Sequence, residues 1–93
     1  MSKESSEIWI NEISWESGSN ILSMEVAGTY TGSNKFIIRA NGEDIWTLDF
    51  DPSFELQYID STFNINFPDD IGHILIEHNI VENNETHTLE LFK

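Results

Sequence analysis

Carboxylates are the one kind of side chain that is numerous enough here to suggest a chemistry. The 93 residues include 17 Asp and Glu against four Lys and Arg, and the formal net charge is −13 at pH 7. Between Lys3 and Lys93 the only basic side chains are those of Lys35 and Arg39. Such a charge repels phosphates and anionic lipids, so we expect no direct contact with nucleic acid or with a membrane. A basic protein surface or a cation remains as a partner.

Two pairs of carboxylates have a spacing that could hold a cation. Asp49 and Asp51 flank Phe50, and Asp69 is followed directly by Asp70. Calcium takes oxygen ligands from loops of this kind. However, the chain has no EF-hand pattern, and Asp is common in ordinary turns. We therefore expect no metal and no cofactor, and these four Asp residues are the candidates if a calcium site exists.

Motifs of enzyme active sites are absent from the sequence. The chain has no Cys, no nucleophile elbow, no glycine-rich phosphate loop and no His-Glu-x-x-His motif. His73, His78 and His87 lack the short paired spacing of a zinc site. Two carboxylates could serve a glycosidase, but among so many some fall roughly 5 to 10 Å apart by chance. We expect that the protein is not an enzyme.

The fold class follows from short stretches in which apolar residues alternate with polar ones. These stretches are rich in Ile, Phe, Trp, Tyr and Thr, which is typical of half-buried strands. Strands are expected over residues 7–15, 22–30, 35–40, 44–50, 54–58, 63–67, 73–82 and 86–92, with turn residues between them. The pattern predicts an all-β fold, a small antiparallel β-sandwich (or barrel) of seven to eight short strands, and we favour the sandwich.

Some details of strand pairing can also be predicted. A change in the apolar parity near Asn11 and Glu12 indicates a bulge. Asn41-Gly42 marks a hairpin, and the buried face favours a three-residue loop that sets Ile38 opposite Trp46 and Phe36 opposite Leu48.

The other face of the same hairpin carries both basic side chains. The predicted register sets Lys35 opposite Asp49 and Arg39 opposite Ile45. In the C-terminal hairpin we expect His78 opposite Glu90, because a loop one residue shorter would place two glutamates in a directly opposed pair.

Residues 1–93 are expected to form a single acidic β domain in which residues 1–6 are disordered. The N-terminal sequence MSKESSE lacks the apolar region of a secretion signal, and no apolar run approaches the roughly 20 residues of a membrane span. We therefore expect a cytoplasmic protein, in the host cell cytoplasm if a phage encodes it.

The carboxylates lie on polar strand positions and in turns, so the charge surrounds the domain. Such an array can imitate nucleic-acid phosphates and occupy the Lys and Arg residues of a nuclease or another nucleic-acid-binding effector. Phage proteins that block restriction or CRISPR effectors, and immunity proteins that neutralise nuclease toxins, share this charge and size. We therefore expect an acidic inhibitor of this kind, acting as a monomer or small homo-oligomer. No motif assigns the chain to a family.

The predicted contact residues combine acidic turns with one aromatic anchor. They are Glu43, Asp44, Asp69, Asp70, Glu82, Glu85 and Trp15. The hairpin tip at residues 41–44 is expected to share a patch either with Glu82 and Glu85 or with the two Asp residues of the 69–70 pair. The alternative is a structural or accessory module that binds calcium or carbohydrate and inhibits nothing, with acidity that only maintains solubility.

Overall fold

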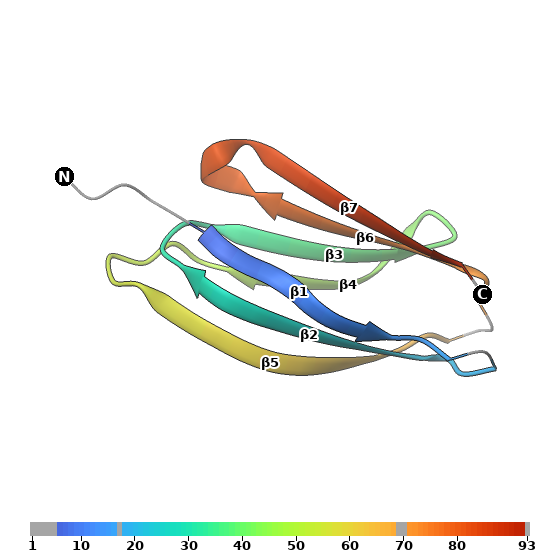
Figure 1. Cartoon of the computed structure of the whole chain (residues 1–93). Coiled ribbons are helices and arrows are strands. Elements are labelled where there is room, and N and C mark those ends of the chain that lie inside the picture. Colours follow the sequence, from blue (N-terminus) through green and yellow to red (C-terminus); the bar gives the residue numbers. More distant parts are fainter. Residues whose placement is uncertain (1–5, 17, 69–70, 93) are drawn as a thin grey trace.

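Two antiparallel sheets form the sandwich that the sequence predicts (Figure 1). The computed structural model describes residues 6–16, 18–68 and 71–92. One sheet has the strand order β1-β2-β5 and the other the order β4-β3-β6-β7. The bounds are β1 (Ser6–Ser14), β2 (Ile21–Tyr30), β3 (Asn34–Ala40), β4 (Glu43–Phe50), β5 (Gln57–Asn66), β6 (His73–Ile80) and β7 (Glu85–Phe92), with a 3-10 turn at Val81–Asn83. The described part of the chain includes no helix with the length and apolarity of a membrane span.

Alternating side chains build the core between the two sheets. In β2, the side chains of Leu22, Met24 and Val26 are completely buried. They pack in one cluster with residues of the facing sheet, among them Phe36 and Ile38 of β3. Because successive side chains of a strand point to opposite faces, the residues between them form the outer faces of the sandwich. Polar side chains at these outer positions are presented to solvent, whereas Asn34 of β3 and His78 of β6 are buried.

A bulge and a glycine fit β1 closely onto β2. The register shifts between Ile10 and Glu12, so the predicted bulge is confirmed. Gly28, which pairs with Ile8, has a φ of 141°. A Cβ atom at this position would collide with the backbone of Glu7 and Ile8. Only glycine accepts both this φ and this close approach.

The β3–β4 hairpin has the register that its buried face predicts. Ile38 pairs with Trp46, and Phe36 pairs with Leu48. Asn41 and the following glycine both have positive φ, as a tight turn requires. These two pairs confirm the register predicted for the buried face, but the predicted three-residue loop is wrong. Ala40 pairs with Glu43, so the loop is Asn41 and Gly42 alone, and the register shift between Ile38 and Arg39 aligns the apolar pairs.

On the outer face of this hairpin one of two predicted pairs was wrong. Lys35 lies opposite Asp49, as expected. Arg39, however, pairs with Asp44 and not with Ile45, because the register shifts between residues 38 and 39. The irregularity brings the guanidinium next to a carboxylate.

Residues 54–58 do not form a strand of their own, which corrects another prediction. β5 begins at Gln57 and runs without a break to Asn66, so it joins two of the strands that we expected. Gln57 pairs with Tyr30, the last residue of β2. Residues 54–56 lie beyond that end of β2, and alternation alone cannot make a strand where the neighbouring strand has ended.

The C-terminal hairpin also differs from its predicted register. His78 pairs with His87, not with Glu90. The connection is longer than expected, because a 3-10 turn occupies residues 81–83 and Asn84 follows in the left-handed conformation with a φ of 54°.

The first strand begins earlier than expected. Ser6, which we had placed in a disordered segment, is the first residue of β1. Its hydroxyl donates a hydrogen bond to Glu82 (2.8 Å) and accepts one from the Asn34 amide (2.9 Å). The rest of that segment, residues 1–5, lies outside the described residues.

The connections fall at two ends of the sandwich (Figure 1). One end carries the β3–β4 hairpin, the β1–β2 turn and the facing ends of β5 and β6. The other end carries the β2–β3 turn, the β4–β5 connection and the β6–β7 turn. Because β3 has 7 residues, the two ends lie about 20 Å apart.

Candidate functional site

The outer face of the three-stranded sheet gathers carboxylates from all three strands. Glu12 of β1 pairs with Glu25 of β2. Asp60 of β5 and Glu7 of β1 occupy outward positions of the same face. We call these four residues the carboxylate face. Glu7, Glu12 and Asp60 are exposed, and Glu25 is half-buried.

No basic side chain balances this charge among the described residues of the same face. Lys35 and Arg39 both lie on β3, which belongs to the other sheet. Directly opposed side chains on neighbouring strands have Cβ atoms roughly 5 Å apart, and like charges at that separation destabilise the pair. The negative charges of the carboxylate face therefore repel one another, and this repulsion lowers the stability of the fold.

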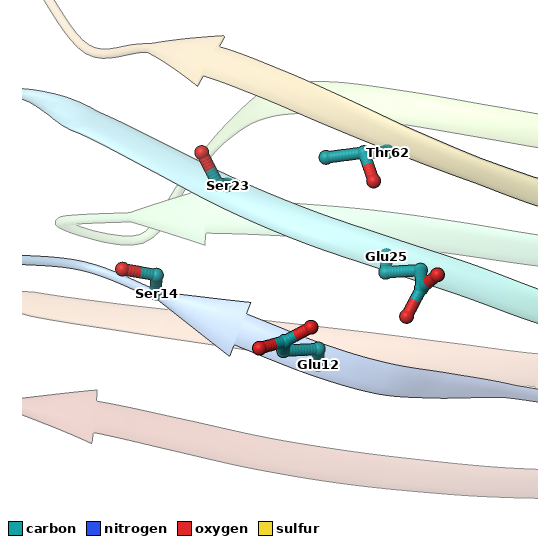
Figure 2. Close-up of a pocket in the computed structure, with 5 residues that line it drawn as sticks. All are labelled: Glu12, Ser14, Ser23, Glu25 and Thr62. Carbon is teal, nitrogen blue, oxygen red and sulfur yellow. The ribbon is translucent and has the colours of Figure 1, made fainter.

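A shallow hollow lies within this face (Figure 2). Its volume is about 210 Å³, and it is lined by Glu12, Ser14, Ser23, Glu25 and Thr62. The two carboxylates and three hydroxyl groups leave the hollow rich in hydrogen-bond acceptors. It suits a ligand group that donates hydrogen bonds and carries positive charge.

The protonation of two of these carboxylates is linked. A hydrogen bond with Glu25 and the negative charge of Glu25 raise the pKa of Asp60. Hydrogen bonds from Asn11 and Asp60 lower the pKa of Glu25, and the Asn11 amide lies 2.9 Å from the Glu25 carboxylate. The raised pKa of Asp60 is the effect expected of two neighbouring carboxylates with no cation between them.

The structure offers no cluster of metal ligands within its described residues. No group of three or more His, Cys, Asp and Glu side chains is placed to hold an ion there. Asp49 and Asp51 lie at the end where β4 finishes, whereas Asp69 and Asp70 fall outside the described residues. The strand ends that flank the 69–70 pair lie at the opposite end of the sandwich.

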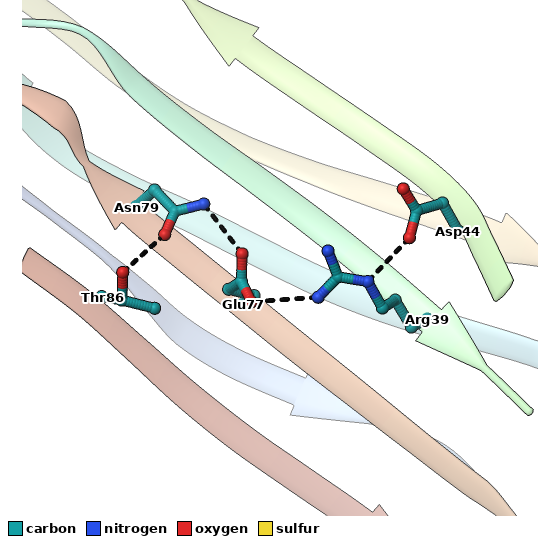
Figure 3. Close-up of polar contacts among 5 residues, drawn as sticks. All are labelled: Arg39, Asp44, Glu77, Asn79 and Thr86. Atoms are coloured by element: carbon teal, nitrogen blue, oxygen red, sulfur yellow. Dashed lines mark hydrogen bonds and ion pairs between the residues drawn. The ribbon is translucent and has the colours of Figure 1, made fainter. Parts of the chain in front are cut away.

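The outer face of the four-stranded sheet, in contrast, holds a cation between two carboxylates (Figure 3). Arg39 donates to Asp44 at 2.7 Å and to Glu77 at 2.9 Å. Asn79 also donates to Glu77, at 2.9 Å, and accepts a hydrogen bond from Thr86 at 2.7 Å. The chain of contacts crosses all four strands. Hydrogen bonds from Asn79 and Arg39 lower the pKa of Glu77, and the two carboxylates raise the pKa of Arg39.

Replacement of Arg39 should destabilise the fold. In an Arg39→Ala variant two carboxylates lose their shared cation, so we expect a lower free energy of unfolding. Arg39→Lys should restore only part of this, because one ammonium lacks the planar fork that reaches both partners. Urea unfolding measures both variants. An unchanged free energy of unfolding in Arg39→Ala would show that these contacts do not stabilise the fold.

The predicted contact residues at the hairpin tip are exposed. Glu43 and Asp44 both lie at the start of β4, and Asp44 is bound to Arg39. Asp69 and Asp70 lie outside the described residues, between strand ends at the same end of the sandwich.

The other two predicted carboxylates lie at the opposite end from the hairpin tip. Glu85 is exposed and lies 3.2 Å from the His87 ring. Glu82 is half-buried in the β6–β7 turn, where it accepts the hydrogen bond from Ser6. These residues cannot share one small patch with the hairpin tip, because the two ends lie about 20 Å apart.

The exposed aromatic residues differ from those expected. Trp15 was predicted to be the most exposed candidate anchor, but it is half-buried, packs against the core and donates its indole N–H to the Ser19 carbonyl at 3.3 Å. Tyr58 is 73% exposed and Trp9 is 44% exposed. Sequence reasoning favoured burial of both, because each lies in a predicted strand, where an aromatic side chain is usually part of the core.

A buried histidine lies beneath Trp9. His78 is 4% exposed, stacks on Phe36 with ring centroids 4.1 Å apart, and lies 2.8 Å from the Asn34 carboxamide oxygen. The amide group of Asn34 donates to Ser6, so the oxygen accepts from His78 Nε2–H. Burial, with the nearby His87, lowers the pKa of His78 to about 4, although Glu82 acts in the opposite direction. His78 is neutral at pH 7.

Comparison with protein-family models, with curated proteins and with solved structures finds no match for this chain.

Proposed function

We propose that the protein inhibits a nuclease or another nucleic-acid-binding effector by occupying the basic surface that the effector uses for nucleic acid. The carboxylate face is the part of the molecule that makes this contact. The observation that carries the proposal is the difference between the two outer faces. One face places both strand cations against carboxylates, and the other face has four carboxylates with no cation among its described residues.

The repulsion within the carboxylate face favours a cationic ligand. An arginine of the partner carries five donors and a permanent charge, so one guanidinium can bind the Glu25 and Asp60 carboxylates together. Such a contact relieves the repulsion from Glu25 that contributes to the raised pKa of Asp60. Binding should therefore lower the pKa of Asp60.

Inhibition follows from competition. Lys and Arg residues that neutralise phosphates exchange them for carboxylates when the inhibitor binds. Long-range attraction accelerates the encounter, and the same attraction repels nucleic acid from the inhibitor itself. Because the charges are exposed, the complex should weaken strongly as salt rises.

An affinity capture tests the proposal. The full chain is immobilised and exposed to extracts of its native host and of phage-infected cells, at low salt and at about 0.5 M salt, where exposed charges are largely screened. We expect a basic nucleic-acid-binding protein that is released by the higher salt and displaced by duplex DNA. Capture that DNA does not affect, or the same capture by a Glu25→Lys, Asp60→Lys variant, would contradict the proposal.

A further inference from the structure

Three large apolar side chains project into solvent from one short segment. Phe54 is 106% exposed, Leu56 is 61% exposed and Tyr58 is 73% exposed. They belong to the β4–β5 connection and the first residues of β5, which extend beyond the end of β2 (Figure 1). Single exposed apolar residues are common, but a group of this size on a small protein usually marks an interaction site.

Hydrogen bonds hold this segment in its projecting shape. The Ser53 backbone N–H donates to the Thr31 carbonyl at 2.7 Å, which ties the connection to the β2–β3 turn. The Ser53 hydroxyl accepts from the Glu55 N–H at 3.3 Å and from the Gln57 amide at 3.2 Å. The Gln57 amide also donates to the Glu55 carbonyl at 3.2 Å. A segment held in this way loses little further conformational entropy when a partner covers its side chains.

The apolar side chains lie among carboxylates and adjoin the carboxylate face. Asp51 and Glu55 are exposed on either side of Phe54 in the sequence. Tyr58 lies on the outer face of β5, two residues before Asp60, and so shares a surface with it. Apolar side chains and negative charge are thus continuous from the connection onto the sheet.

We propose that residues 53–58 form an anchor that enters an apolar pocket with a basic rim on the partner protein. This inference rests on the proposed function and adds the contact that slows dissociation, since carboxylates alone give a salt-sensitive and promiscuous complex. The surrounding carboxylates match a rim of Lys and Arg. A second copy of the chain is a poor occupant of the same contact, because each copy carries a charge of −13.

The inference predicts a selective effect of Phe54→Ala. Its ring is fully exposed, so the fold should keep its melting temperature, while the affinity for the captured partner should fall about 30-fold, mainly through faster dissociation. Phe92→Ala is the matched control, since Phe92 is 72% exposed on the other sheet at the other end of the molecule. Binding kinetics and thermal melts are measured for both variants.

Cross-linking identifies the surface that covers the anchor. With p-benzoylphenylalanine in place of Phe54, cross-links should reach apolar residues of the captured partner that have Lys or Arg neighbours. Cross-links only between copies of the chain would overturn the proposal. If Phe54→Ala binds like the wild type while Glu25→Lys with Asp60→Lys does not, the anchor is excluded and the proposed function stands. If neither variant changes binding, or nothing is captured, both fail.

Discussion

Replacement of two carboxylates by lysine, Glu25→Lys together with Asp60→Lys, is expected to weaken the complex with the basic partner about 100-fold at low salt. Each reversal converts an attraction at the interface into a repulsion, and a cost of about 1.4 kcal/mol per site corresponds to a tenfold loss. At about 0.5 M salt the difference should shrink, because the screening length falls to roughly 4 Å. Binding kinetics at several salt concentrations measure the effect.

The matched control changes the net charge equally on the other sheet. Asp49 and Glu90 are exposed on the four-stranded sheet, so Asp49→Lys with Glu90→Lys should reduce the affinity only slightly. Equal losses in the two double variants would mean that net charge, and not the carboxylate face, governs binding. Glu43→Lys tests the hairpin tip separately.

A neutral variant separates binding from folding. Glu25→Gln with Asp60→Asn removes the repulsion between the two carboxylates that raises the pKa of Asp60. We expect an equal or higher melting temperature together with weaker partner binding. A lower melting temperature would mean that these carboxylates serve the fold.

The second large effect is the dependence of the free energy of unfolding on pH through His78. The pKa of His78 is about 4 in the fold and 6.5 at its model value, so the unfolded chain takes up the proton first as the pH falls. The stability that neutral His78 contributes is therefore complete above pH 6.5 and is lost progressively toward pH 4. At 1.36 kcal/mol per pKa unit, the loss in the free energy of unfolding is about 3 kcal/mol.

Comparison with His78→Gln isolates this effect from the carboxylates. Protonation of the acidic surface reduces repulsion over part of the same range, and it does so in both proteins. The variant should be less stable than the wild type at pH 7, because it loses the stacking on Phe36, but its stability should fall less between pH 6.5 and pH 4.5. Urea unfolding across this range gives the difference. The same slope in both proteins would show that His78 is not the titrating group.

Sequence reasoning was accurate where one face of a strand is buried. The alternation in β2 and the register of Ile38 with Trp46 follow from that burial, because a shift of one residue would expose the core. It failed where the chain conformation depends on an element that is remote in sequence. Residues 54–56 alternate like a strand, but whether they can pair depends on where β2 ends. The C-terminal hairpin depends on the left-handed Asn84, whose effect on loop length is not visible in the sequence.

The candidate site was harder to predict from the sequence than the fold. Glu25 could be recognised as an outward-facing strand residue, but its proximity to Asp60 depends on the pairing of β2 with β5, which no local pattern encodes. The predicted patch therefore concentrated on acidic turns. The position of Trp15 shows the same difficulty, because burial of an aromatic beside a turn depends on how that turn folds back.

The proposed function requires that the carboxylate face and nucleic acid compete for one surface of the partner. Its most direct test is the displacement of fluorescent duplex DNA from the captured partner, measured by anisotropy at low salt. We expect displacement by the wild type and by Asp49→Lys with Glu90→Lys, but little displacement by Glu25→Lys with Asp60→Lys. A ternary complex, in which the protein binds the partner while DNA stays bound, would contradict it.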